Sequence, residues 1–392
     1  MSKRWLSFLS HAARHPYALL PGTPDGIINS AHDWVGHRQR STPADIRRGP
    51  AAAVWEIVPA GVHCNPAPRC VDEGVAPACL RLFPTPAASL FFLRGARVLG
   101  SDGVVISPDN RVFAEFTYAD DAGGIESHSV FRRRRIPAPR PLRGAYATLC
   151  YPSSTAYAHW MAESLPRLRL LEPHLAALDG IFVPDGLPAS MRESLTAFGV
   201  RPDQVVPLAI ASHVAPEHLY VPAYCAGLDI APWVPTYLRS RVLGDAAATS
   251  PTRRLYVSRR KVGRRRILNE DDVVRVLARR GFETVHPEEL GFAEQARLFS
   301  EARVVVGASG AALFNALFCA PGGSLIEIPP HVSLGCHYYH SIASVAGLDY
   351  WVVPGSAPAQ APRDGTLDHV DFQADIEALD RTLGAVLASG TE

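Results

Sequence analysis

The stretch RVVVGASGAALFNALF, Arg303 to Phe318, places glycines and small residues between an apolar strand and an apolar helix. Small residues at such a turn let a ligand approach the backbone, and the amides and dipole of the first helical turn favour an anion. Glu327 ends the next apolar segment, twenty residues after Gly307, and an acid at that distance holds a ribose hydroxyl in dinucleotide-binding folds. The pattern predicts a nucleotide site, although the G-x-x-G from Gly307 to Gly310 does not by itself distinguish NAD from a nucleotide sugar.

A basic run, SRRKVGRRRILNE at residues 258–270, follows the apolar strand RLYVS. Arginine side chains bind phosphate oxygens in pairs, so a cluster of arginines at the end of a strand suits a diphosphate. A solvated basic loop is the structural alternative, as plain strand–helix packing is for the glycine turn. Because both motifs fall at the same edge of a predicted parallel sheet, an anion site is the stronger interpretation of the pair.

A helical segment, YAHWMAESLPRLRLLEPH at residues 157–174, carries a third group of polar residues. At 100° per residue, His159, Glu163 and Arg167 fall within one stripe, and apolar residues fill the opposite face. Pro166 lacks a backbone N–H and predicts a kink near Glu163. An ordinary amphipathic helix would have the same stripe, but the proline suits the wall of an active site better.

Composition limits the class of protein. With 392 residues and 47% hydrophobic content the chain is long enough for two cores, since single domains usually stop growing near ~250 to 300 residues. The 39 basic and 38 acidic residues nearly cancel, which argues against a nucleic-acid partner. The seven cysteines include no C-x-x-C, which fits a reducing compartment and predicts a cytoplasmic protein.

Membrane attachment is expected to be peripheral if it occurs at all. No stretch of the chain reaches the ~18 apolar residues that a transmembrane helix needs. Attachment at the inner face of a membrane through Trp5, Leu6, Phe8 and Leu9 is left open.

The predicted secondary structure changes along the chain. Residues 1–145 are predicted to form a β-rich segment of an N-terminal lobe, with short alternating strands separated by turns. Helices around short strands follow in residues 146–248, and the small, proline-broken stretch 244–253 is the predicted linker. Strands and helices then alternate strictly, which predicts a parallel sheet covered on both faces in a C-terminal lobe, residues 249–392. A final amphipathic helix is expected to begin at an Asp371 cap.

The blocks HWMAESLPRL, RRLYVSRRKVGRRRILNE, GFAEQARLFSEARVVVGASGAALFNALF and SLIEIPP occur in this order within about residues 90–355. In their order and spacing they resemble the glycosyltransferases of family 61. The resemblance implies an α/β fold of the GT-B type, in which two Rossmann-like lobes face a cleft. It further implies inversion at the anomeric carbon, a nucleotide-sugar donor held by the C-terminal lobe and an acceptor met by the N-terminal lobe.

Matching positions imply the residues that bind the donor. They are Arg259, Arg266, Asn269 and Glu270 in the basic run, Gly307, Ser309, Gly310, Ala311 and Asn315 at the glycine turn, and Glu327 at the strand end. The turn would then hold the diphosphate, with Glu327 on the ribose. Ser309 stands where the family usually has the histidine of G-x-H-G, and a hydroxyl can donate to a phosphate oxygen but carries no positive charge.

An inverting transfer needs a base that takes the proton of the acceptor hydroxyl. Glu163 is the first candidate because it lies at the predicted kink, and His159 is the second, in which case Glu163 would orient the imidazole. Trp160 and Arg167 are expected on the acceptor side of the cleft. No Asp-x-Asp occurs in the chain, so neither a metal nor a cofactor is expected, and arginines and backbone amides would neutralise the leaving group.

The predicted function is therefore an inverting, metal-independent glycosyltransferase that uses a nucleotide sugar and a glycan or lipid-linked acceptor. By resemblance to bacterial members, assembly of a capsule or another surface polysaccharide is the expected setting. A non-catalytic protein that binds nucleotide sugars or polysaccharides is the main alternative, because of Ser309. An NAD-dependent oxidoreductase is the weaker one, since nothing else in the chain supplies a hydride-transfer site.

Overall fold

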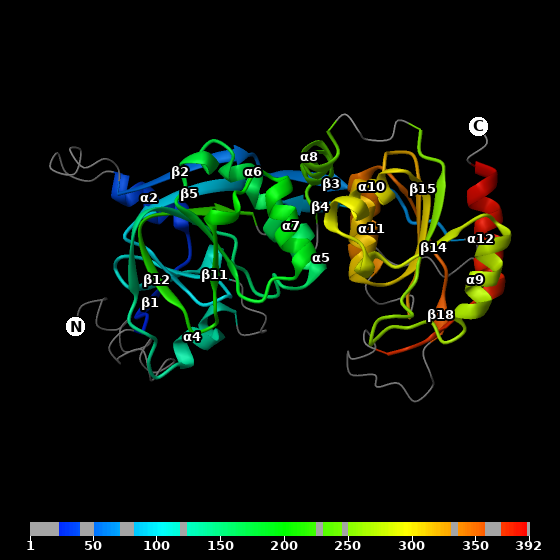
Figure 1. Ribbon diagram of the computed structural model, residues 1–392. Helices are drawn as coiled ribbons and strands as arrows, with labels where there is room; N and C mark the ends of the chain where they lie inside the picture. Colours follow the sequence, from blue (N-terminus) through cyan, green and yellow to red (C-terminus); the bar gives the residue numbers. More distant parts are fainter. Residues whose placement is uncertain are drawn as a thin grey trace. The chain divides into compact units, whose positions relative to one another are not determined.

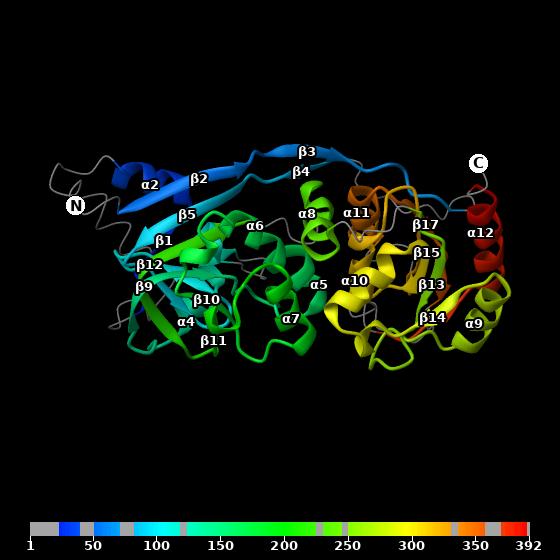
Figure 2. The ribbon, with the colours of Figure 1, turned by 45° about the horizontal axis from the view of Figure 1, so that its top comes forward.

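The structure is a computed structural model and describes residues 23–39, 51–70, 82–117, 124–224, 230–244, 250–330, 336–356 and 370–389. Contacts divide the chain into two units, unit 1 with residues 1–60 and 86–225 and unit 2 with residues 61–85 and 226–392. Each unit combines a sheet with helices (Figures 1 and 2), which confirms the predicted α/β class. The N-terminal residues considered for membrane attachment lie outside the described residues.

Unit 1 is built on one sheet of ten strands that contains both parallel and antiparallel pairs. Four strands run parallel to one another, in the order β12 (His213–Ala223), β9 (Arg140–Thr148), β10 (Gly180–Pro184) and β11 (Val205–Leu208). The other strands are β1 (Gly26–Ile28), β2 (Ala52–Val58), β5 (Ala88–Arg94), β6 (Arg97–Leu99), β7 (Val104–Ile106) and β8 (Arg111–Phe113). The β-rich start of the chain and the α/β part that follows thus share a sheet, and the predicted boundary at residue 145 lies inside β9.

The segment between β9 and β10 is an irregular helix that changes its hydrogen-bond pattern along its length. Its parts are α5 (Tyr157–His159), the π-helical η3 (Trp160–Ser164), the 3-10 helical η4 (Leu165–Arg167) and α6 (Leu168–Leu171). Pro166 has no N–H to give to the carbonyl of Ala162, so a regular α-helical ladder cannot pass through it. The α-helical pattern is thus interrupted at the turn that carries Glu163, where a kink was predicted, and π-turns inside helices are frequent at functional sites.

The remaining helices of unit 1 are short and lie mostly in connections. Among the described residues they are α2 (Ala31–Gln39), α4 (Ser129–Arg132), α7 (Ala189–Ala197), η1 (Ala114–Phe116), η2 (Ile125–Ser127), η5 (Leu175–Ala177) and η6 (Pro202–Gln204). The core of the unit gathers apolar side chains of β5, β12 and β10, including Phe91, Leu93, Leu219 and Phe182.

Unit 2 contains a five-stranded sheet in the spatial order β14–β13–β15–β16–β17, with all neighbours parallel. The strands are β13 (Arg253–Val257), β14 (Glu283–Val285), β15 (Ala302–Ala308), β16 (Ser324–Ile328) and β17 (Asp349–Val352). Runs such as VVVGA and SLIEI suit strands that are buried on both faces, and the parallel sheet predicted from the alternation is confirmed. Numbered along the chain the order is 2-1-3-4-5, a doubly wound arrangement whose order reverses between β13 and β15. Ligands bind beyond the carboxyl ends of the strands at such a reversal.

Helices cover both faces of this sheet. Figure 1 shows α9 (Glu270–Arg279) and α12 (Ile376–Ser389) on one side, and α10 (Phe292–Ser300) and α11 (Cys336–Ala346) on the other. The smaller helices are α8 (Trp233–Val242), η8 (Pro287–Glu289) and η9 (Ala311–Phe318), and the pair β18 (Gly355–Ser356) and β19 (Gln373–Ala374) precedes α12.

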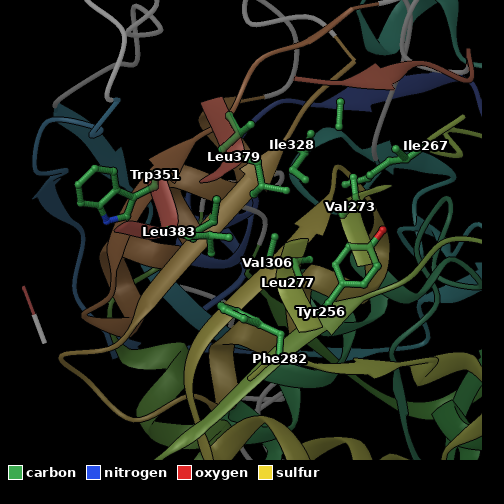
Figure 3. Close-up of a cluster of buried hydrophobic side chains, with 14 of the residues drawn as sticks. Tyr256, Ile267, Val273, Leu277, Phe282, Val306, Ile328, Trp351, Leu379 and Leu383 are labelled. Carbon is green, nitrogen blue, oxygen red and sulfur yellow. The ribbon is translucent and has the colours of Figure 1, made fainter. Parts of the chain in front are cut away.

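The core beneath α9 and α12 explains why the last helix docks where it does. Figure 3 shows Val273 and Leu277 of α9 with Leu379 and Leu383 of α12, packed over sheet residues that include Val306. The predicted apolar stripe of α12 is therefore correct. Its predicted start is wrong, because the N–H of Ala378 donates to Oδ1 of Asp375 at 2.9 Å, and Asp375 rather than Asp371 caps the helix.

Residues 61–85 come early in the chain but pack with unit 2. β3 (Gly61–Cys64) pairs with β4 (Leu82–Thr85). Between these strands, the backbone of Arg69 forms a parallel bridge to β17, in which its N–H donates to Tyr350 and its carbonyl accepts from Val352. Contacts also divide the chain at residue 225 rather than at the predicted 248, since α8 packs with η9 and α11. Residues 245–249 of the predicted linker lie outside the described residues. No helix in the described part of the chain has the length and apolar content to cross a bilayer.

Candidate functional site

The glycine turn, residues 307–310, lies at the reversal point of the unit 2 sheet. Gly307 is in register with Val257 of β13 on one side and with Glu327 of β16 on the other. The basic run begins directly after Val257. The shared edge that the sequence predicts for the basic run, the glycine turn and Glu327 is therefore present.

Arg259 is the arginine of the basic run that reaches the turn. Its side chain is nearly buried, and Nε and Nη2 donate to the carbonyls of Arg265 at 3.2 Å and Arg264 at 2.9 Å. Its Nη1 lies so close to Gly310 that a Cβ on that residue would overlap it. Burial, followed by the charge of Arg265, lowers the pKa of Arg259 to about 10. A desolvated guanidinium held by carbonyls alone favours an anionic partner.

Glu327 and Ser309 form a buried pair at the same place. Oε1 of Glu327 accepts a hydrogen bond from the Ser309 hydroxyl, and Oε2 accepts one from the hydroxyl of Tyr350 at 2.5 Å. Burial raises the pKa of Glu327 to about 7, against the effect of these two hydrogen bonds and of Arg265. Because Glu327 is 0% exposed, it offers no surface to a ribose, and its carboxylate instead contacts Ser309.

Two residues at the turn were not predicted. Arg265 has a left-handed backbone with a φ of 55°, which is uncommon outside glycine, and its Nε is buried without a hydrogen-bond partner. Tyr339 of α11 is buried, and its hydroxyl forms a hydrogen bond with the backbone of Gly310. Arg265 lies in the basic run and could have been selected by its charge. Tyr339 belongs to no motif recognised in the sequence.

Three predicted donor ligands shape the basic run instead of facing the turn. Arg266 binds Asp371 through Nε at 2.9 Å and Nη2 at 2.6 Å. The amide of Asn269 exchanges two hydrogen bonds, both of 2.9 Å, with the backbone of Ala374. Together with a bridge from Ile267, these contacts hold the run against the segment before α12.

Glu270, the third of them, anchors the start of the run. Its Oε1 accepts hydrogen bonds from the hydroxyls of Tyr256 at 2.9 Å and Ser258 at 2.6 Å, and the carboxylate is almost buried. Burial, followed by the charge of Glu270 and its hydrogen bond, raises the pKa of Tyr256. Glu270 thus fixes the course of the chain from β13 towards Arg259.

The remaining turn residues differ in role. Gly307 allows close packing, because a Cβ there would lie 2.9 Å from Leu313. Asn315 is fully buried and donates to Gln295 at 2.8 Å, which makes it a core residue. Ala311 is half-buried and begins the predicted helix after the turn, which is the 3-10 helix η9.

A second group of polar residues lies on the irregular helix of unit 1. Nδ1 of His159 is 2.9 Å from Oε2 of Glu163, and the side chains are 33% and 1% exposed. When Nδ1 carries the proton and donates to the carboxylate, the other ring nitrogen is a free acceptor. The geometry therefore favours the second of the two predicted arrangements, in which Glu163 orients His159.

The two predicted acceptor residues beside this pair are core residues. Trp160 is fully buried, and its Nε1 donates to the Ser194 hydroxyl at 2.9 Å. Arg167 is also buried, donates to the carbonyl of Tyr224 at 3.0 Å and lies over the ring of Tyr151. Both side chains hold the irregular helix against the rest of unit 1. The helical periodicity of the sequence does not distinguish this structural role from ligand binding.

No group of three or more His, Cys, Asp and Glu side chains suited to a metal ion occurs within the residues that the structure describes.

Residues 157–326 match the family model described as Glycosyltransferase 61, which confirms the family resemblance for this region. The matched region contains both His159 with Glu163 and the glycine turn. Its end lies one residue before Glu327.

Curated proteins with a similar stretch carry a glycosyltransferase name as well. The chain is 36% identical over 91 residues to Protein O-linked-mannose beta-1,4-N-acetylglucosaminyltransferase 2 of Canis lupus familiaris, a stretch that is 22% of this chain and 16% of that protein. It is 33% identical over 137 residues to the Mus musculus protein of the same name, 33% of this chain and 23% of that protein. The chain thus spans less than a quarter of the length of these relatives.

Proposed function

We propose that this protein is an inverting, metal-independent glycosyltransferase of GT-B type that moves a sugar from a nucleotide sugar to a hydroxyl of a glycan or glycoconjugate. The observation that carries the proposal is the buried Arg259 at the reversal point of a doubly wound sheet, inside the region that matches family 61. Assembly of a surface polysaccharide, in the cytoplasm or at the inner face of the membrane, is the setting that fits this reaction.

Unit 2 would bind the donor. The diphosphate would lie against the glycine turn, where Arg259 supplies a desolvated cation. Ser309, held by Glu327, has a hydroxyl oxygen of fixed position. Charge on the leaving diphosphate grows as the glycosidic bond breaks, so a preorganised cation at this place stabilises the transition state more than the ground state.

Unit 1 would supply the base. The half-exposed ring of His159 can reach a substrate, whereas Glu163 beside it is buried. In the proposed step, the free ring nitrogen of His159 takes the proton of the acceptor hydroxyl. The hydroxyl oxygen attacks the anomeric carbon of the donor, and the nucleoside diphosphate leaves. Glu163 holds the imidazole in the required tautomer and stabilises its protonated form.

A panel of nucleotide sugars tests the donor site, because any ligand of the folded state raises the melting temperature. UDP-N-acetylglucosamine is the first member, since the named relatives transfer N-acetylglucosamine. A donor that stabilises the protein is then tested for transfer to oligosaccharide and lipid-linked acceptors, with and without EDTA. Turnover that EDTA abolishes and magnesium or manganese restores contradicts metal independence. Donor binding without turnover on any acceptor supports the non-catalytic alternative, for which Ser309 in place of histidine is the favouring observation.

A further inference from the structure

Glu327 is an ionisable group enclosed at the proposed anion site. Both of its oxygens are held by neutral hydroxyl groups, those of Ser309 and Tyr350. It is paired across the sheet with Gly307, the first residue of the glycine turn. A ligand anion on this turn therefore comes close to a buried carboxyl group, and two negative charges in such a place repel each other strongly.

The groups around Glu327 come from four neighbouring segments. α11 contributes Tyr339, and the ring of His340 beside it packs at a tilt against Tyr350 of β17. The basic run contributes Arg265, whose charge acts directly on Glu327, and Arg259, whose charge acts on Tyr339. The fourth segment is the turn itself, with the Ser309 hydroxyl. Arg265 is the cation whose Nε is buried without a partner, and its left-handed backbone is the kind of strain that occurs at ligand sites.

We propose that a diphosphate binds this site together with one proton, that Arg265 pairs with the diphosphate, and that Glu327 accepts the proton. The inference rests on the proposed donor site. Before binding, the charge of Arg265 favours the ionised carboxylate. A bound diphosphate neutralises that charge and adds negative charge nearby, and both effects favour the carboxylic acid.

The hydrogen bonds of the pair allow this change without a large movement. In the ionised state the Ser309 hydroxyl donates to Glu327. Once the carboxyl group is protonated, its O–H can donate to Ser309, and the Ser309 hydroxyl is free to donate to a phosphate oxygen. The proton comes from solvent, and no covalent bond other than the O–H of Glu327 is formed. Burial already brings the pKa of Glu327 to about 7, so a modest further rise is sufficient near neutral pH.

Calorimetric titration with a nucleotide sugar tests the coupling, because its diphosphate is a diester that takes up no proton near neutral pH. UDP-, GDP-, dTDP- and ADP-linked sugars are the probes, each titrated at pH 7.5 in Hepes and in Tris. These buffers differ in ionisation enthalpy, so proton uptake makes the observed enthalpies differ. The Kd should rise by up to about tenfold per pH unit above pH 7, since the bound state holds the extra proton.

Glu327→Gln should abolish the buffer dependence and flatten the pH profile of Kd. His340→Gln, which removes a neighbouring imidazole whose pKa burial lowers from its ordinary value, should keep both. Arg265→Ala should weaken binding and reduce the proton uptake. If the Glu327→Gln variant does not fold, infrared difference spectra of the unmodified protein give the same answer, since ligand binding should produce the band of a protonated carboxyl group.

A nucleotide sugar that binds with equal enthalpy in the two buffers and a constant Kd from pH 6.5 to 8 overturns the inference and leaves the donor site intact. If none of the probes binds, the proposed donor site is overturned, and the inference with it. Proton uptake that persists in Glu327→Gln and disappears in His340→Gln shows that Glu327 is not the acceptor.

Discussion

The guanidinium of Arg259 lies against the backbone of Gly310, so close that a Cβ on Gly310 would overlap Nη1. The φ of Gly310 is −175°, an extended conformation that any residue can adopt. The glycine is therefore needed for space and not for backbone freedom. This contact joins the two sequence motifs, the basic run and the glycine turn, into one site.

Gly310→Ala should weaken nucleotide-sugar binding, because the new methyl group must displace Arg259 from the turn. Gly263→Ala is the matched control, since a Cβ at this glycine of the same basic run meets nothing within 4 Å. Calorimetric titration of both variants decides the matter. Equal affinities would mean that the position of Arg259 on the turn has no part in donor binding.

Arg259→Ala and Arg266→Ala should differ sharply. Charge-assisted bonds to phosphate contribute roughly 1.5 to 3 kcal/mol, so loss of Arg259 should raise the Kd by about 10- to 150-fold. Arg266 is exposed and already occupied by Asp371, and its removal should leave the Kd nearly unchanged. A larger loss of affinity in Arg266→Ala than in Arg259→Ala would mean that the diphosphate binds at the exposed side of the basic run, beside Arg266.

Local patterns in the sequence predict much of unit 2 and less of unit 1. The alternating strands and helices after residue 250 have strong local signals, and their order along the chain leads to the observed parallel sheet. In unit 1 the sheet joins β5, from the predicted β-rich segment, to β12, more than a hundred residues later. Such pairing depends on contacts between distant residues, which local periodicity does not encode.

The candidate site shows the same division at the level of single residues. The sequence predicts the edge at which Arg259, Gly310 and Glu327 meet. It does not separate a ligand from a supporting residue, because Asn269 and Arg266 are polar whether they bind phosphate or the segment before α12. Arg265 was missed because its charge does not distinguish it from the other arginines of the basic run. Tyr339 was missed because its approach to Gly310 appears only in three dimensions.

The pH dependence of stability should reveal the burial of Glu327. Its pKa is about 7 in the folded protein against an ordinary value of 4.5, so the folded state holds the proton more tightly than the unfolded state. The stability from this group is complete below pH 4.5 and is lost as the pH rises towards 7. The melting temperature of the unmodified protein should therefore fall relative to that of Glu327→Gln over this range. Parallel curves for the two proteins would mean that Glu327 is ionised throughout.

The contact between His159 and Glu163 leads to a prediction about the chemical step. His159→Ala should lower kcat by roughly 10² to 10⁴, the usual contribution of general base catalysis, while the donor Kd stays unchanged. Added imidazole should restore part of the rate, since it can occupy the space of the missing ring. His174→Ala is the control, because this half-buried histidine of the same unit packs against the ring of Tyr220 and should leave kcat near normal.

Glu163→Gln separates the two roles within the pair. If Glu163 only orients His159, the amide keeps a hydrogen bond to Nδ1 and should lower kcat less than His159→Ala does, and imidazole should not restore the loss because the ring is still present. If Glu163 is itself the base, Glu163→Gln should cause the larger loss and His159→Ala the smaller one. Single-turnover measurements with saturating donor distinguish these outcomes, because they report the chemical step without product release. Normal single-turnover rates in both variants would remove the pair from the mechanism and leave it as a support of the irregular helix.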